Sequence, residues 1–152
     1  MSENLSKNVV TKRIKPDGSS YAVAAGSAAV TSDIVDCSGY DGIRFILAMG
    51  AITSGAVTSC KVQQNTANSA SGMADLLGSS ITIAATDDDK LIITEIIKPQ
   101  ERYLCMITSR ATQNAVIDGL IVEFFNPRTK PVTQDSTVAT LEVHASPAEG
   151  TA

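Results

Sequence analysis

The amino-acid sequence predicts an all-β protein: an antiparallel β-sandwich or a jelly-roll-like barrel with extended N- and C-terminal arms. Between residues 20 and 127, about seven or eight short runs of β-branched and aliphatic residues alternate with turn residues, which is the pattern of successive strands. No run has an apolar periodicity that would support a helix of three turns. Strands that follow one another without intervening helices favour antiparallel sheets over an α/β arrangement. The length of 152 residues is that of one domain.

Each expected strand is a short apolar run bounded by Gly, Pro, Asn, Asp or Ser. In chain order they are residues 30–36, 43–49, 57–64, 81–83, 91–97, 103–108 and 115–125. The clearest strand is 43–49, in which the alternate residues from Ile43 to Met49 are all apolar and share one face. Such a strand is expected to cover one side of a core.

Local features suggest how some of these strands are joined. Strands 43–49 and 57–64 are separated by a medium-length turn and are expected to form a hairpin. Strand 91–97 is apolar on both faces over most of its length, so we expect it to be central in its sheet. Residues 73–77 are expected to form a single helical turn, and Gly119 indicates a possible bulge in the last strand.

The chain divides into an N-terminal arm (1–18), a β domain (19–127) and a C-terminal extended tail (128–152). The arm is locally basic and is either a frayed terminus or a tether on an acidic neighbour. The tail carries alternating apolar residues, so part of it is able to add as a strand to a neighbouring subunit. The residues predicted to contact a partner are Lys7, Lys12, Arg13, Lys15, Val138, Leu141 and Val143.

Composition argues against several classes of partner. The formal net charge of −4 argues against general binding of nucleic acid, which depends on clustered Lys and Arg. No apolar run approaches the roughly 20 residues of a membrane-spanning helix, and the N-terminus lacks the apolar core of a secretory signal, so synthesis in a cytoplasm is expected. Aromatic residues make up only 4% and Trp is absent, which disfavours stacking sites for sugars or bases.

No residue pattern predicts catalysis, a cofactor or a metal site. Cys37, Cys60 and Cys105 are widely spaced in apolar stretches, where a free Cys is expected to behave as a small buried hydrophobe. The single histidine, His144, falls in the tail. The acidic run 87–89 lacks the ligand spacing of a calcium loop and is expected to be a solvated turn. The sequence therefore predicts a structural or assembly protein rather than an enzyme.

Five segments resemble a group of small proteins encoded among the virion structural genes of tailed bacteriophages. They are residues 38–45 (SGYDGIRF), 50–57 (GAITSGAV), 101–103 (ERY), 112–119 (TQNAVIDG) and 146–152 (SPAEGTA). The resemblance implies a capsid decoration (cement) protein on the virion surface, with a β-rich fold, the major capsid protein as partner and a homo-oligomer, most often a trimer. It transfers no functional residue, because none of the segments is a chemical motif.

Two other classes of function remain open from the sequence. The first is a tail, baseplate or fibre-associated protein that binds a host surface glycan or protein through the loop at 65–80. The second is an enzyme of the hydrolase class, which would need a pocket where acid and base groups converge.

Overall fold

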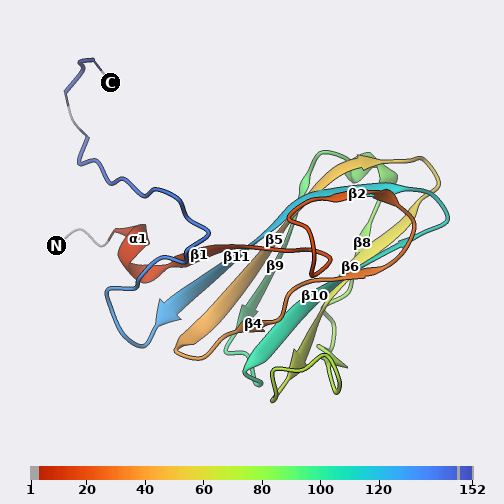
Figure 1. The fold of residues 1–152 in the computed structure, drawn as a ribbon, viewed down its shortest axis with the longest axis horizontal. Helices are drawn as coiled ribbons and strands as arrows, with labels where there is room; N and C mark the ends of the chain where they lie inside the picture. The colour runs from red at the N-terminus through yellow and green to blue at the C-terminus, as the bar shows by residue number, and fades with distance from the viewer. Residues whose placement is uncertain (1–3, 147, 152) are drawn as a thin grey trace.

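The computed structural model describes residues 4–146 and 148–151, and it shows two antiparallel sheets packed face to face (Figure 1). Sheet A has the order β1 (Val10–Ile14), β11 (Ala115–Pro127), β5 (Tyr40–Ile52) and β9 (Leu91–Ile97), with β2 (Val23–Gly26) also on β11. Sheet B has the order β3 (Val30–Thr31), β10 (Tyr103–Ala111), β6 (Val57–Asn65) and β7 (Ala74–Asp75), with β4 (Val35–Asp36) on β10 and β8 (Ile81–Ile83) on β6. The helical elements are α1 (Leu5–Asn8) and the 3₁₀ turn η1 (Ala85–Asp87). Residues 1–3, 147 and 152 of the predicted arm and tail lie outside the described residues.

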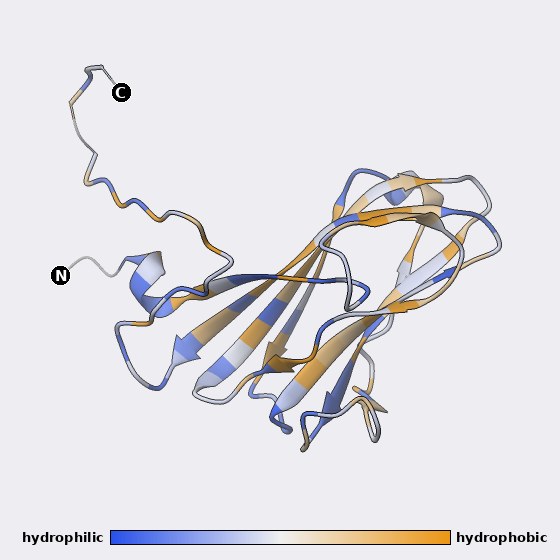
Figure 2. Ribbon diagram, in the orientation of Figure 1, coloured by the Kyte–Doolittle hydropathy of each residue, from blue (hydrophilic) through white to orange (hydrophobic). Residues whose placement is uncertain are grey.

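The core lies between the two sheets and follows from the two-residue period of the strands. On β5, the alternate residues from Ile43 to Met49 are at most 2% exposed, as predicted from their spacing. They pack in one cluster with Leu104 and Met106 of β10 in the opposite sheet. Figure 2 shows the apolar residues concentrated along these strands. The predicted all-β fold is confirmed, and its form is that of a sandwich.

Individual strands also match their predicted positions. β8 and β9 have the predicted bounds, 81–83 and 91–97. Gly119 lies next to a register irregularity between β11 and β5, where a bulge was expected. The predicted strand 30–36 is divided into β3 and β4, which pair with successive parts of β10.

Three local predictions are wrong. β5 and β6 do not form a hairpin, because the chain passes from sheet A to sheet B between them, and the Thr53 N–H bonds the Asn114 carbonyl instead. Residues 73–77 are not a helical turn, since Ala74 and Asp75 pair with β6. β9 is at the edge of sheet A, not its centre, and its odd-numbered residues, which lie on the outer face of the sheet, are exposed.

The N-terminal segment differs from the arm expected over residues 1–18. Residues 10–14 form β1, which pairs with β11 and buries Val10 and Ile14. The spacing of these two residues places both on the inner face of a strand, but only two apolar residues are involved, which is too short a pattern to recognise in the sequence. The expected C-terminal tail begins with residues that return to β1, and its end runs away from the sandwich (Figure 1).

Candidate functional site

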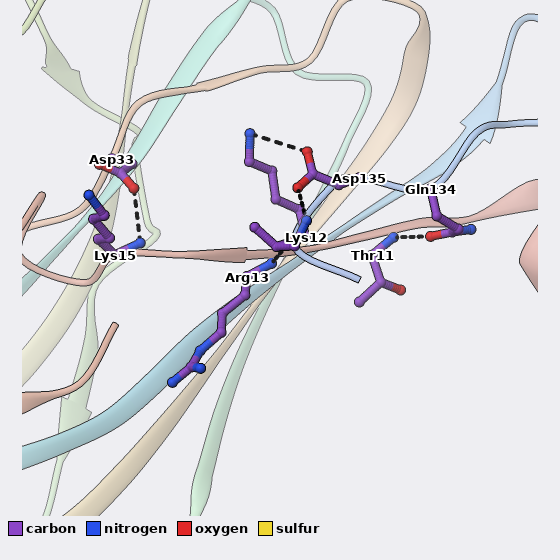
Figure 3. A network of polar contacts seen from close by, with 8 residues as sticks. Thr11, Lys12, Arg13, Lys15, Asp33, Gln134 and Asp135 are labelled. Carbon is purple, nitrogen blue, oxygen red and sulfur yellow. Dashed lines mark hydrogen bonds and ion pairs between the residues drawn. The ribbon is translucent and has the colours of Figure 1, made fainter. Parts of the chain in front are cut away.

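The candidate site is the junction where the C-terminal tail meets the outer edge of β1. β1 is an edge strand, and the backbone N–H groups of Thr11 and Arg13, and of Lys15 directly after the strand, point away from β11. Each is bound by a side-chain oxygen (Figure 3). The pairs are Thr11 N to Gln134 Oε1 at 3.0 Å, Arg13 N to Thr137 Oγ1 at 2.9 Å, and Lys15 N to Asp33 Oδ2 at 3.0 Å. The edge is therefore closed to a further strand.

Gln134 takes the place of a residue in a neighbouring strand. Its side-chain Oε1 accepts from the Thr11 N–H, while its Nε2 donates to the carbonyls of Val9 at 2.7 Å and Ser6 at 3.0 Å. A residue of a paired parallel strand would likewise bond the Val9 carbonyl and the Thr11 N–H. One amide side chain thus holds the base of the tail against both α1 and β1.

Lys12 and Asp135 form an ion pair at the same junction, with 3.5 Å between Nζ and Oδ2 (Figure 3). Burial alone would raise the pKa of the Asp135 carboxyl, but hydrogen bonds from Thr137 and the charge of Lys12 outweigh it. The pKa of Asp135 is consequently below its ordinary value of 3.8. Lys12, a predicted partner contact, is thus engaged with its own chain.

The other predicted basic residues lie in different surroundings. The Arg13 guanidinium carbon is 5.0 Å and the Lys15 Nζ 5.8 Å from the ring centroid of Tyr21, so both cations lie over one aromatic ring. Lys7 is exposed in the last turn of α1. The structure therefore brings Arg13 and Lys15 together and places Lys7 and Lys12 elsewhere.

The three predicted apolar residues of the tail lie near the N-terminal segment. Val138, Leu141 and Val143 line a groove of about 550 Å³ together with Leu5 of α1 and Val9. Leu141 and Val143 remain 53% and 57% exposed. The His144 Nε2 lies 3.0 Å from a Glu142 carboxylate oxygen, and both residues line the same groove. The tail thus has an anchored base and an exposed, alternating outer part.

The outer face of sheet A is a second exposed surface, and the sequence did not identify it. Ile93 of β9, Ile46 of β5 and Ile121 of β11 are in register across three strands. Ile93 is 50% exposed and Ile121 39%. Two residues along β5 from Ile46, in the next row of outward-facing side chains, Arg44 forms ion pairs with Glu95 and Glu123 on the two neighbouring strands. The signal that could have located this face is the second apolar side of strand 91–97.

A buried cation, Arg110, is a structural residue that the sequence analysis also missed. Its guanidinium donates to the carbonyls of Ala24 and Ala28 at 2.9 Å and of Ala115 at 2.8 Å, and only 6% of the residue is exposed. The three bonds fasten the β2 segment over the end of the sandwich. Arginine in a short strand is usually exposed, so its burial depends on carbonyls distant in sequence.

The cysteines show why this chain offers no reactive thiol at neutral pH. Cys37, Cys60 and Cys105 are buried and free, as predicted. Burial, with a smaller contribution from the Asp36 charge, raises the pKa of Cys37 to about 12. Burial alone raises the pKa of Cys60 to about 11 and also raises that of Cys105. Each thiol therefore stays protonated and packs as an apolar group.

Neither a metal site nor a membrane-spanning helix is found within residues 4–146 and 148–151. No three His, Cys, Asp or Glu side chains there are placed to hold a metal ion together, and none of the helices is long and apolar enough to cross a membrane. In comparisons with known proteins, no family model matches the chain and no curated protein matches it.

Proposed function

We propose that this chain is a structural protein of a tailed-bacteriophage virion that binds and stabilises the capsid lattice, as a decoration or cement protein does. Its partner is the major capsid protein, its place is the capsid surface, and it acts as a homo-oligomer, with a trimer favoured. The action is binding rather than chemistry. The sequence resemblance described above motivates the proposal.

The observation that carries the proposal is the apolar outer face of sheet A. A sandwich needs only the inner face of each sheet for its core, yet Leu91, Ile93 and Ile97 expose 60%, 50% and 64% of their surface. Exposed apolar side chains that are contiguous on one face indicate a contact surface. The ion pairs of Arg44 with Glu95 and Glu123 lie in the row between Ile93 and Ile97, so the charges within this face are already paired with one another.

Rigidity of the scaffold supports the same function. Gln134 and Thr137 bind the outward N–H groups of β1, so the tail fixes this edge strand of sheet A in place. Repetition of a modest contact over a symmetric shell multiplies its strength through avidity. A small β-sandwich with one apolar face and an anchored tail fits this mode of binding.

The first test is the copy number of the chain in purified phage particles, measured by quantitative mass spectrometry against the major capsid protein. A lattice protein is expected at parity with the capsid subunit or at a simple fraction of it. A few copies per particle would instead favour a tail, baseplate or fibre position. Absence from particles would refute the virion proposal.

A matched pair of variants then tests the proposed surface. Ile121→Lys places a charge in the outer row of sheet A, whereas Val57→Lys makes the same kind of change at a 62% exposed position in sheet B. Burying an uncompensated charge in an apolar contact is expected to weaken binding to the shell by at least about tenfold. We expect this loss for Ile121→Lys alone. Equal binding by the two variants would show that the outer face is not the contact.

A further inference from the structure

The two edges of sheet A differ in whether their outward backbone N–H groups are hydrogen-bonded. At β1 the outward N–H groups are bound by side chains, as described above. At the other edge, β9 pairs with β5 alone among the described residues. The Lys98 N–H donates to the Asp41 carbonyl and the Met49 N–H to the Lys90 carbonyl, so even-numbered residues of this strand face β5. The N–H and C=O groups of residues 91, 93, 95 and 97 therefore point outward, along an open edge.

The open edge of β9 lacks the features that usually prevent strand addition. The strand contains no proline, and its register with β5 runs without a bulge from Leu91 to Ile97. Its side chains on the outer face are apolar and exposed at three of four positions. An added strand would bond the outward N–H and C=O groups of this edge, and its own apolar side chains would extend the exposed outer face of sheet A.

We propose that the C-terminal tail of a second copy, residues 139–145, adds as a strand to the open edge of β9. In the structure these residues are exposed and pair with no strand of their own chain. Leu141 and Val143 alternate with Glu142 and His144, which is the two-residue period of a strand with one apolar face. The same chain therefore contains both an unpaired strand-like segment and an unpaired sheet edge.

The side chains of the tail segment 139–145 complement those that β9 presents at its open edge. When Leu141 and Val143 extend the apolar outer face, Glu142 and His144 lie on the inner side of the added strand. On that side β9 presents Thr94, whose Oγ1 is buried without a hydrogen-bond partner among the described residues. A carboxylate from Glu142 is a suitable acceptor for the Thr94 hydroxyl.

A groove beside the β9 edge provides a second match. It has a volume of about 590 Å³ and is lined by Gln64 of β6 and by residues 95–98. The Gln64 Oε1 is also buried without a partner, and an imidazole N–H of His144 is the type of donor that it lacks.

The distances require the tail to come from another copy. Thr137 is held at the β1 edge by its bond to the Arg13 N–H, and Leu141 is four residues further on, a reach of at most about 14 Å. A strand added beyond β9 lies four strand spacings from β1, or about 19 Å. A tail cannot reach its own β9, so each copy donates to the next. Such head-to-tail contacts form a closed ring or an open chain of copies.

The test is self-association of the purified full chain, followed by sedimentation velocity over a range of concentrations. We expect the average sedimentation coefficient to rise with concentration. A chain that ends at Val138 should stay monomeric, whereas a control chain that ends at Ala145 should associate like the full chain. In the full chain, the amide protons of residues 91, 93, 95 and 97 should exchange more slowly than in the chain that ends at Val138.

A mixing experiment separates this proposal from other contacts between copies. Ile93→Pro removes an outward N–H of β9 and leaves the tail intact, so it blocks the acceptor edge. We expect Ile93→Pro and the chain ending at Val138 each to be monomeric alone and to form a 1:1 complex when mixed, because one supplies the tail and the other the edge. Val143→Asp, at an exposed tail position, blocks the donor without touching β9.

Two results would overturn the inference: a full chain that is monomeric at every concentration, or a chain ending at Val138 that associates as the full chain does. The measurement uses no capsid, so its outcome is independent of the proposed function. Association of purified copies together with absence from particles would remove the virion proposal and leave this one standing.

Discussion

Replacement of Gln134 by alanine tests whether one side chain closes the β1 edge. The substitution removes three hydrogen bonds, those from the Thr11 N–H and to the carbonyls of Ser6 and Val9. A typical hydrogen bond contributes about 0.5–1.5 kcal/mol net. All three are only partly buried, so water replaces some of what is lost. We therefore expect Gln134→Ala to lower the free energy of unfolding by about 1.5–3 kcal/mol.

The assay is urea denaturation, combined with hydrogen exchange of the Thr11 amide. Loss of the Oε1 acceptor should make this amide exchange faster, while amides of β11 change little. Gln134→Glu keeps an acceptor for the Thr11 N–H but places a carboxylate oxygen against the carbonyls of Val9 and Ser6, so it should protect the Thr11 amide and yet be no more stable than Gln134→Ala. Gln113→Ala, the same change at an exposed turn position, should stay within about 0.5 kcal/mol of the wild type.

The reasoning about the edge would be refuted by one combination of results. If Gln134→Ala unfolds within about 0.5 kcal/mol of the wild type and the exchange of the Thr11 amide is unchanged, the tail is not what protects β1. The base of the tail would then be a loosely attached segment, and the fixed position of Thr137 used to calculate the reach of the tail would also fail.

Three further predictions concern the sandwich itself. Arg110→Met leaves three carbonyls without their donor, so it should lower the free energy of unfolding, measured by urea denaturation, by about 3 kcal/mol or more. A loss below about 1 kcal/mol would show that water replaces the guanidinium. A hydrogen bond from Arg102 holds the pKa of Asp36 well below 3.8, so this pair stabilises the fold above about pH 3.8 and loses its effect as the pH falls through the lowered pKa. Asp36→Asn should therefore make the acid-induced fall in unfolding free energy shallower, and an unchanged slope would contradict this assignment. A Cβ at Gly42 would overlap the Phe125 ring, so Gly42→Ala should lower the free energy of unfolding by about 1–3 kcal/mol. The loss should be smaller when Phe125 is also replaced by Leu. Equal losses in both backgrounds of this double-mutant cycle would exclude the clash.

The fold class was predictable because it depends on short-range alternation. A buried strand face needs an apolar side chain at every second residue, and β5 meets this requirement from Ile43 to Met49 without reference to any other part of the chain. The bounds of β8 and β9 were predictable for a similar reason, since turn residues flank both. Burial of the three cysteines likewise follows from their apolar surroundings in the sequence.

Of the candidate site, the sequence located the segments but not their contacts. The alternation of Leu141 and Val143 marked the tail, and the cluster of basic residues marked the N-terminal segment. That Lys12 pairs with Asp135 rather than facing a partner could not be inferred, because the two residues are brought together only by folding. The role of Gln134 was equally hidden, since it bonds a residue 123 positions away.

The sequence by itself determined that this chain is an all-β protein, a sandwich or a jelly-roll-like barrel, with an apolar core and a strand-like C-terminal segment. Only the tertiary structure decided which strands lie at the edges, and hence that β1 is closed by side chains while β9 is open. The physical reason is that the alternation of apolar and polar residues is a local property of the sequence. Whether a strand lies at the edge or the centre of its sheet depends instead on pairing between strands that are distant in the chain. A strand with two apolar faces therefore has the same sequence pattern at the centre of its sheet as at the edge, where β9 lies.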